Sequence, residues 1–160
     1  MARMSQDGEQ GSERGARVRI PPPLWYAVAI VAGLLLPGLR MQMGAMRTGI
    51  GILAIFAGLG LGLSAVSWFR RTGQNPKPWT TSPELIIQGS YRFTRNPMYV
   101  GLTLGTVGIA LLTGRGWMVL LGVGALAAVH FTAVVHEERY LTEKFGDAYR
   151  SYMARVRRYL

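Results

Sequence analysis

The stretch NPMYVGLTLGTVGIALLTGRGWMVLLGVGALAAVHFTAVV, residues 96–135, decides the fold. Its one Lys, Arg, Asp or Glu side chain is Arg115, which lies in the turn Thr113-Gly114-Arg115-Gly116. The uncharged arms on either side, 96–114 and 116–135, are each close to the roughly 20 residues with which a helix crosses a bilayer core. The stretch therefore predicts a hairpin of two membrane-spanning helices.

Two earlier uncharged segments, 20–39 and 48–69, extend this pattern to four. Each is apolar all round rather than along one stripe, and a soluble bundle of 160 residues cannot bury four such helices. The chain is 49% hydrophobic but 16% charged, whereas soluble domains carry about a quarter charged residues. We expect an all-α, polytopic membrane protein with about four transmembrane helices, formed by residues 20–160 behind a flexible cytoplasmic tail, 1–19.

The formal net charge of +10 is distributed unevenly around these segments. The loop between the first two spans holds only Arg40 and Arg47, whereas the 70–95 stretch and the segment after the fourth span hold most of the basic residues. The positive-inside bias then places both termini in the cytoplasm, and we expect a bacterial inner-membrane protein. The charge is explained by topology and anionic lipid, so no nucleic-acid partner is expected. The absence of Cys excludes disulfides and a thiol nucleophile.

Apolar residues recur at helical spacing after the fourth span, between charged positions: Leu141, Phe145, Tyr149, Tyr152, Val156 and Leu160. This pattern predicts a C-terminal amphipathic helix, broken at Gly146, that lies either on the membrane surface or on the 70–95 loop.

Glycines at small-xxx-small spacing occur in the second and third spans. Gly101 and Gly105 are predicted to serve helix packing. The run Gly58-Leu-Gly60-Leu-Gly62 has two interpretations, helix packing or ligand binding, because glycine allows close approach of either a helix or a ligand. Both readings stay open at this point.

Polar residues without a surface explanation gather in two places. Asn96 precedes Pro97 and is a natural N-cap, with Pro97 as the first helical residue and Tyr91, Arg95 and Tyr99 around it. The second group follows the fourth span: His130, His136, Glu137 and Glu138. The two histidines are six residues apart, so the i, i+4 spacing of a metal site is missing and no metal is expected. Carboxylates on one wall and an Arg/Asn helix start on the other suit a zwitterionic ligand.

The sequence around these two groups resembles that of a known superfamily. The run Gly89-Ser-Tyr-Arg-Phe-Thr-Arg-Asn-Pro-Met-Tyr-Val-Gly101, followed by Glu137-Glu-Arg-Tyr-Leu141 and Phe145-Gly-Asp-Ala-Tyr149, resembles the isoprenylcysteine carboxyl methyltransferase and phospholipid methyltransferase superfamily. Its members are integral membrane enzymes that use S-adenosylmethionine. The resemblance spans about residues 75–160 and implies that they form the catalytic core.

The resemblance also implies site residues, position by position. The cofactor-binding residues would be Leu85, Ile86, Tyr91, Arg95, Asn96, Pro97, Met98, Tyr99, Glu137 and Glu138, with Gly60 and Gly62 as a Gly-x-Gly motif. Asn96 stands where the carboxyl methyltransferases have histidine and where the phospholipid enzymes have asparagine. An acceptor amine must lose a proton, and His130, Glu138 and Tyr99 are the candidate catalytic residues to receive it.

One departure bears on the acceptor. In the carboxyl methyltransferases an arginine one helical turn before the acid binds the substrate carboxylate, and here that position is Ala133. The expected function is therefore methyl transfer from S-adenosylmethionine to a lipid or lipophilic acceptor, with a lipid amine such as phosphatidylethanolamine favoured over an isoprenylcysteine-type carboxyl group. A small non-enzymatic membrane assembly or transporter subunit is the alternative of another class. The oligomeric state stays open.

Overall fold

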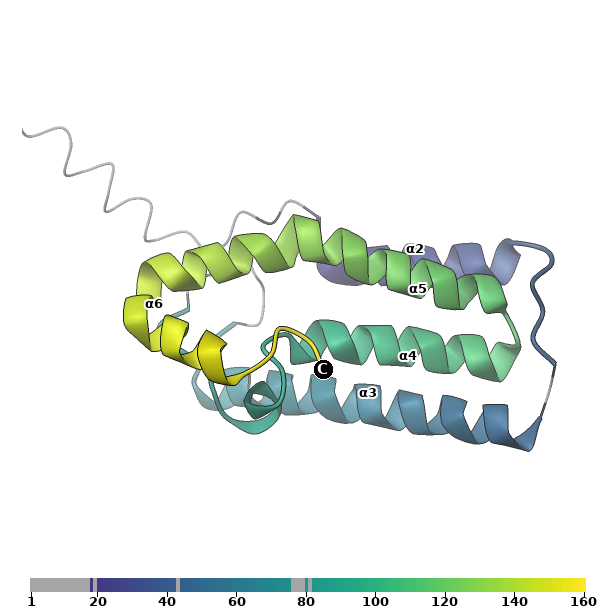
Figure 1. The fold of residues 1–160 in the computed structure, drawn as a ribbon, viewed down its shortest axis with the longest axis horizontal. Coiled ribbons are helices and arrows are strands. Elements are labelled where there is room, and N and C mark those ends of the chain that lie inside the picture. Colours follow the sequence, from purple (N-terminus) through teal and green to yellow (C-terminus); the bar gives the residue numbers. More distant parts are fainter. Residues whose placement is uncertain (1–17, 19, 43, 76–79, 81) are drawn as a thin grey trace, which may run out of the picture.

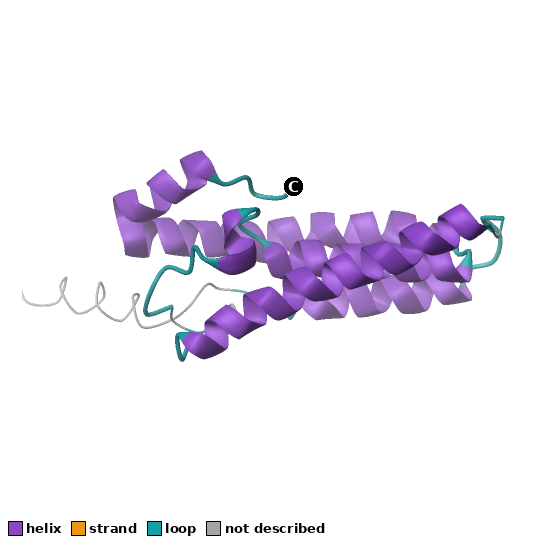
Figure 2. Ribbon diagram, turned by 90° about the horizontal axis from the view of Figure 1, so that it is seen from below, coloured by secondary structure: helices purple, strands orange, loops and turns teal. Residues whose placement is uncertain are grey.

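The computed structural model describes residues 18, 20–42, 44–75, 80 and 82–160, and helices dominate them (Figure 2). Helices α2 (Pro22–Leu35), α3 (Ala45–Arg71), α4 (Pro97–Thr113) and α5 (Gly116–Val129) run side by side in two layers (Figure 1). Helix α2 packs against α5, and α3 packs against α4. Within the described residues the only bridge-type pairing joins Arg40 to Arg115, so the predicted all-α class is confirmed. The predicted tail lies outside the described residues except for Val18, which belongs to the buried core.

The lengths of the four helices differ from the expected spans. Helix α3, with 27 residues, and the continuous helix Gly116–Arg155 are long and apolar enough to cross a membrane. Helices α2 and α4 have 14 and 17 residues, fewer than the roughly 20 expected. The reason is local: α2 begins at the proline run and ends before Pro37, while α4 begins at Pro97 and ends at Gly114. All four predicted apolar segments are thus helical, and two of these helices are shorter than the segments that predicted them.

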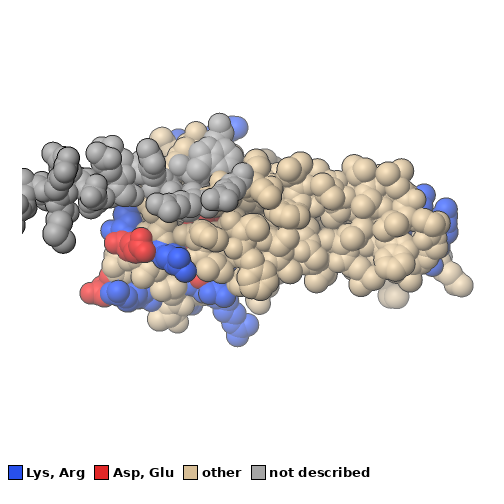
Figure 3. Space-filling view, turned by 90° about the horizontal axis from the view of Figure 1, so that it is seen from above, with Lys and Arg blue, Asp and Glu red and all other residues tan. Residues whose placement is uncertain are grey.

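On the face of the bundle drawn in Figure 3, the middle of the bundle is covered by residues other than Lys, Arg, Asp and Glu. Only 17% of the most apolar window of α3 is buried, and Leu53, Phe56 and Leu63 are each about two-thirds exposed. Lys, Arg, Asp and Glu gather at the two ends in this view. A surface of this kind is stable when lipid rather than water covers it. The helices therefore fit a membrane-associated protein.

Close backbone contact holds α3 against α4. A Cβ added at Gly58 would lie 2.5 Å from the carbonyl oxygen of Gly101, and one at Gly101 would lie 2.6 Å from that of Gly58. Gly51 and Gly108 make a similar approach farther along the same pair of helices. The predicted packing role of Gly101 is confirmed, and the backbone nitrogen of Gly105 lies in the same contact.

Helix α5 continues through a π-helical turn, η2 (His130–Val134), into α6 (Val135–Arg155). At Gly146 the backbone has φ +52°, which glycine adopts readily, and the second half of α6 turns back toward the start of α4 (Figure 1). The predicted break at Gly146 is confirmed. Of the two predicted positions for this helix, the structure has the one on the 70–95 loop, because the Tyr152 hydroxyl donates to the Tyr91 carbonyl at 2.7 Å.

Candidate active site

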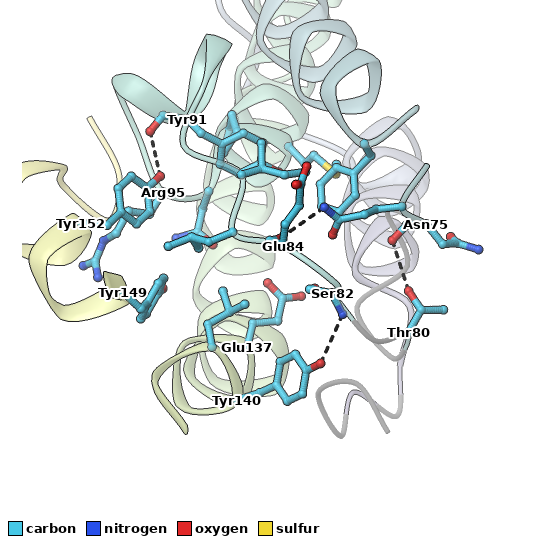
Figure 4. A pocket seen from close by; sticks show the side chains of 18 of the residues that line it. Asn75, Thr80, Ser82, Glu84, Tyr91, Arg95, Glu137, Tyr140, Tyr149 and Tyr152 are labelled. Atoms are coloured by element: carbon cyan, nitrogen blue, oxygen red, sulfur yellow. Dashed lines mark hydrogen bonds between the residues drawn. The ribbon is translucent and has the colours of Figure 1, made fainter. Parts of the chain in front are cut away.

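A pocket lies at the end of the bundle where α3, α4 and α6 meet (Figure 4). Three segments line it. The first runs from the end of α3 through the following loop and contributes Phe69, Gln74, Asn75, Thr80, Ser82, Glu84, Leu85 and Ile86. The second joins the short helix η1 (Gly89–Arg92) to α4 and contributes Tyr91, Arg95, Asn96, Pro97, Met98 and Tyr99. The third is α6, with Glu137, Tyr140, Leu141, Tyr149 and Tyr152.

The acidic wall of the pocket is Glu137, near the start of α6. The Tyr99 hydroxyl, from α4, donates a hydrogen bond of 2.6 Å to Glu137 Oε1. Tyr91 also lines the pocket, and burial together with the nearby Glu137 charge raises the pKa of its hydroxyl. Tyr91 therefore stays a neutral hydroxyl. Burial raises the pKa of the Glu137 carboxyl to about 7, and a cation bound beside it would favour the ionised form.

The basic wall is Arg95, whose side chain is 10% exposed. Its Nη1 lies 3.3 Å from Glu138 Oε1, and its Nε has no hydrogen-bond partner among the described residues. Gln74 Oε1, another buried atom of the lining, likewise has no partner there. Buried donors and acceptors without partners are costly, so a polar ligand in this pocket would compensate them.

Asn96 differs from its predicted role as a helix cap. It occupies the N-cap position, and Pro97 is the first residue of α4 as expected, but the Asn96 side chain makes no capping bond. Its amide Nδ2 donates instead to the carbonyl oxygen of Arg158, 3.0 Å away. The Asn96 carbonyl accepts from the N–H groups of Tyr99 and Val100. A tertiary contact has replaced the local bond that the sequence pattern predicts.

The two adjacent carboxylates face different partners. Glu138 is absent from the pocket lining and receives two hydrogen bonds from Arg158, Nε to Oε1 at 3.0 Å and Nη2 to Oε2 at 2.7 Å. His130, the other candidate proton acceptor, has its Nδ1 2.9 Å from the Tyr159 hydroxyl and is also absent from the lining. Of the three predicted catalytic residues, the structure places Tyr99 alone in this pocket.

Of the remaining residues predicted to bind the cofactor, some line the pocket and others do not. Leu85, Ile86, Met98 and the other predictions from the loop and α4 line the pocket. Gly60 and Gly62 on α3 do not, and nothing described lies within 4 Å of a Cβ added at either. Among the described residues, no group of three His, Cys, Asp or Glu is arranged to hold a metal.

Sequence reasoning missed three tyrosines of the lining, Tyr140, Tyr149 and Tyr152. Tyr149 and Tyr152 belong to the helical repeat of the C-terminal segment, where tyrosine also suits a membrane interface. The sequence pattern therefore contained these tyrosines, but it was compatible with a helix on the membrane surface and with a helix on the 70–95 loop. The turn at Gly146 decides between them, because it directs this half of α6 back over the pocket.

A second cavity, a groove of about 580 Å³, lies between α2, α3 and α4. Its described lining is apolar apart from the polar groups of Tyr26 and Thr106. The Tyr26 hydroxyl donates to the Tyr99 carbonyl at 3.2 Å and lies 2.9 Å from Thr103 Oγ1. Gly62 lines this groove, and Met98 lines both cavities. The polar pocket and the apolar groove therefore share a lining residue in the first turn of α4.

Comparisons with known proteins agree with this arrangement. The model of the family described as "Phospholipid methyltransferase" matches residues 46–148, which include α3, α4, α5 and the first part of α6. The chain is 33% identical over 72 residues to "Protein-S-isoprenylcysteine O-methyltransferase" of Schizosaccharomyces pombe (strain 972 / ATCC 24843). That alignment covers 45% of this chain and 30% of the relative.

Proposed function

The chain belongs to the phospholipid methyltransferase family, and we propose that it is a membrane-embedded methyltransferase that uses S-adenosylmethionine to methylate a lipid or lipophilic acceptor. The observation that carries this proposal is that Met98 lines both a polar, charged pocket and an apolar groove. A reaction between a water-soluble donor and a lipid acceptor needs two such binding regions, open to different phases, with the reacting atoms brought together where they join.

The charged and aromatic residues of the pocket suit the chemical groups of S-adenosylmethionine. Glu137 would bind the ammonium group, and the unpartnered Nε of Arg95 would bind the carboxylate. The aromatic rings of Tyr91, Tyr149 and Phe69 offer faces for the adenine and for the cationic sulfur. When bound, this cofactor supplies a methyl group on a positively charged sulfur, ready for direct transfer to a nucleophile.

The groove suits the apolar part of the acceptor. Its walls come from three helices whose outer surfaces are apolar, so a lipid chain can enter from the side without crossing water. The head of that lipid would reach Met98 and, beside it, Tyr99. The Tyr99 oxygen would accept the proton that an acceptor amine loses, while its own O–H proton passes to Glu137 along the existing 2.6 Å hydrogen bond.

The surroundings of Ala133 favour a lipid amine as acceptor. Ala133 is fully buried in the apolar core with Tyr26, Tyr99 and Val129, so no cation stands at that position to bind a carboxylate. The described lining of the groove contains no lysine or arginine. The relative named as an isoprenylcysteine O-methyltransferase supports a second candidate, methyl-ester formation on a carboxyl group.

The pocket end of the bundle would face the cytoplasm, where the soluble cofactor is available. Most of the basic residues that the structure describes belong to the 70–95 stretch, α6 and the segment after it, at this end. At the other end Arg40 pairs with Arg115, and Arg47 lies beside Gly114. We propose a bacterial inner-membrane location on the same ground.

A radiolabel experiment tests the function directly. Membranes containing the protein would be incubated with S-adenosylmethionine labelled in its methyl group, and lipid, protein and soluble fractions counted. The lipid-amine reading predicts label in phosphatidylethanolamine derivatives, and the carboxyl reading predicts label released by base. No transfer to any fraction, together with no cofactor binding by the folded protein, would favour a non-enzymatic membrane subunit.

A further inference from the structure

The segment after α6, residues 156–159, returns to the residues just before α4 and bonds to them through its backbone (Figure 1). The N–H of Arg95 donates to the Arg157 carbonyl at 2.9 Å. The Arg158 carbonyl accepts two bonds of 3.0 Å, from Thr94 Oγ1 and Asn96 Nδ2. Three consecutive residues that lead into α4 are thus held by two consecutive carbonyl groups.

The side chains of the same segment bind the other side of the site. Arg158 makes its paired hydrogen bonds to Glu138 on α6, and this contact raises the pKa of the Arg158 guanidinium. Arg158 is 41% exposed, whereas Glu138 is 13% exposed and also faces Arg95. Tyr159 pairs with His130 in the π-helical turn. One short segment therefore connects the α4 start, the α6 start and η2.

Residues 156–159 do not line the pocket, but they contact residues that line it or lie next to its lining. Arg95 and Asn96 belong to the pocket wall from α4, and Glu138 is the neighbour of Glu137 in the wall from α6. Successive side chains of a helix point about 100° apart. A Glu138 carboxylate fixed on Arg158 therefore fixes the rotation of α6 at this point, and with it the direction in which Glu137 points.

We propose that residues 157–159 form a clasp that sets cofactor affinity, with Arg158 as a positioning residue that keeps the two charged walls of the pocket at a fixed separation. This inference rests on the proposed function, because it assigns the clasp to the S-adenosylmethionine site. Paired arginine–carboxylate bonds define a separation more strictly than a single ammonium contact does, because two parallel N–H groups must both be met.

The experiment compares four proteins in the same detergent: wild type, Arg158→Ala, Arg158→Lys and Arg150→Ala. Arg150 is the matched control, since it is an arginine of α6 paired with Asp147 on the exposed surface. Calorimetric titration with S-adenosylhomocysteine gives the Kd. We expect Arg158→Ala to weaken binding about 10-fold, Arg158→Lys to recover part of that loss, and Arg150→Ala to change it less than about 2-fold.

A double-mutant cycle separates positioning from a general loss of structure. If Arg158 acts through Glu138, the protein with both Arg158→Gln and Glu138→Gln should bind about as well as the weaker single variant. Hydrogen exchange at the Arg95 amide, which bonds to Arg157, should accelerate in Arg158→Ala while the amides of α3 keep wild-type rates. The glutamine variant carries the test if the alanine variant does not fold.

Two outcomes overturn the clasp. One is wild-type cofactor affinity in the folded Arg158 variants, and the other is additive losses in the double-mutant cycle. A wild-type protein that is folded but binds no S-adenosylhomocysteine would overturn the proposed function itself, which distinguishes the two failures.

Discussion

The pocket and the groove share Met98 but differ in nearly everything else. The pocket combines a half-buried glutamate, a nearly buried arginine and several tyrosines. Within the part of the chain that the structure describes, Arg95 Nε and Gln74 Oε1 have no hydrogen-bond partner. The groove is walled by three apolar helices and has hydroxyl groups from two residues. If the proposed function is right, this difference separates a water-soluble cofactor from a lipid acceptor, so a change in one cavity should leave binding in the other intact.

The largest expected effect concerns the charge of the pocket. Glu137→Ala should weaken S-adenosylhomocysteine binding about 1000-fold, because removing one partner of a buried charge pair costs about 2–5 kcal/mol. Calorimetry on the purified protein measures this Kd. Glu143→Ala, at an exposed acid of the same helix, is the control. Affinity within about 3-fold of wild type in a folded Glu137→Ala protein would remove Glu137 from the cofactor site.

The second largest expected effect is on the rate of methyl transfer, and it concerns Tyr99, which lies next to Met98. Tyr99→Phe removes the hydroxyl that bonds to Glu137 and should lower kcat about 100-fold, as loss of a proton-transfer group does. The cofactor Kd should change little, since the ring remains in the wall. Single-turnover methyl transfer at saturating cofactor gives the rate. An unchanged rate would show that the proton leaves by another route.

The smallest effect concerns the groove. Gly62→Leu places a side chain where nothing described lies within 4 Å, so the fold should tolerate it while the groove becomes narrower. The acceptor KM should rise about 10-fold with the cofactor Kd unchanged. Gly49→Leu, at an open glycine of α3 outside the groove lining, is the control. A lost cofactor affinity with normal acceptor KM would instead support the Gly-x-Gly reading.

The fold was predictable where apolar length and proline position determine it. The uncharged segments located the four helices, and Pro97, Gly101 and Gly146 have their expected places at a helix start, a close contact and a turn. The spanning length of α2 and α4 was overestimated, because apolar residues continue past the points where proline and glycine end the helix.

The site was predictable where the motif residues themselves line it. Asn96 and Glu138 show what sequence could not give, since both side chains bond to Arg158, some 62 and 20 positions away along the chain. A local rule assigns Asn96 to a helix cap, and the family resemblance assigns Glu138 to the cofactor site. Contacts so distant in sequence leave no periodicity or spacing from which to infer them.

An experimental structure of the protein in lipid nanodiscs with S-adenosylhomocysteine tests the central claim most directly. The account predicts the ligand's amino-acid end between Glu137 and Arg95, its sulfur turned toward Met98, and lipid in the groove between α2, α3 and α4. A ligand bound outside this pocket, or a sulfur turned away from Met98, would contradict it.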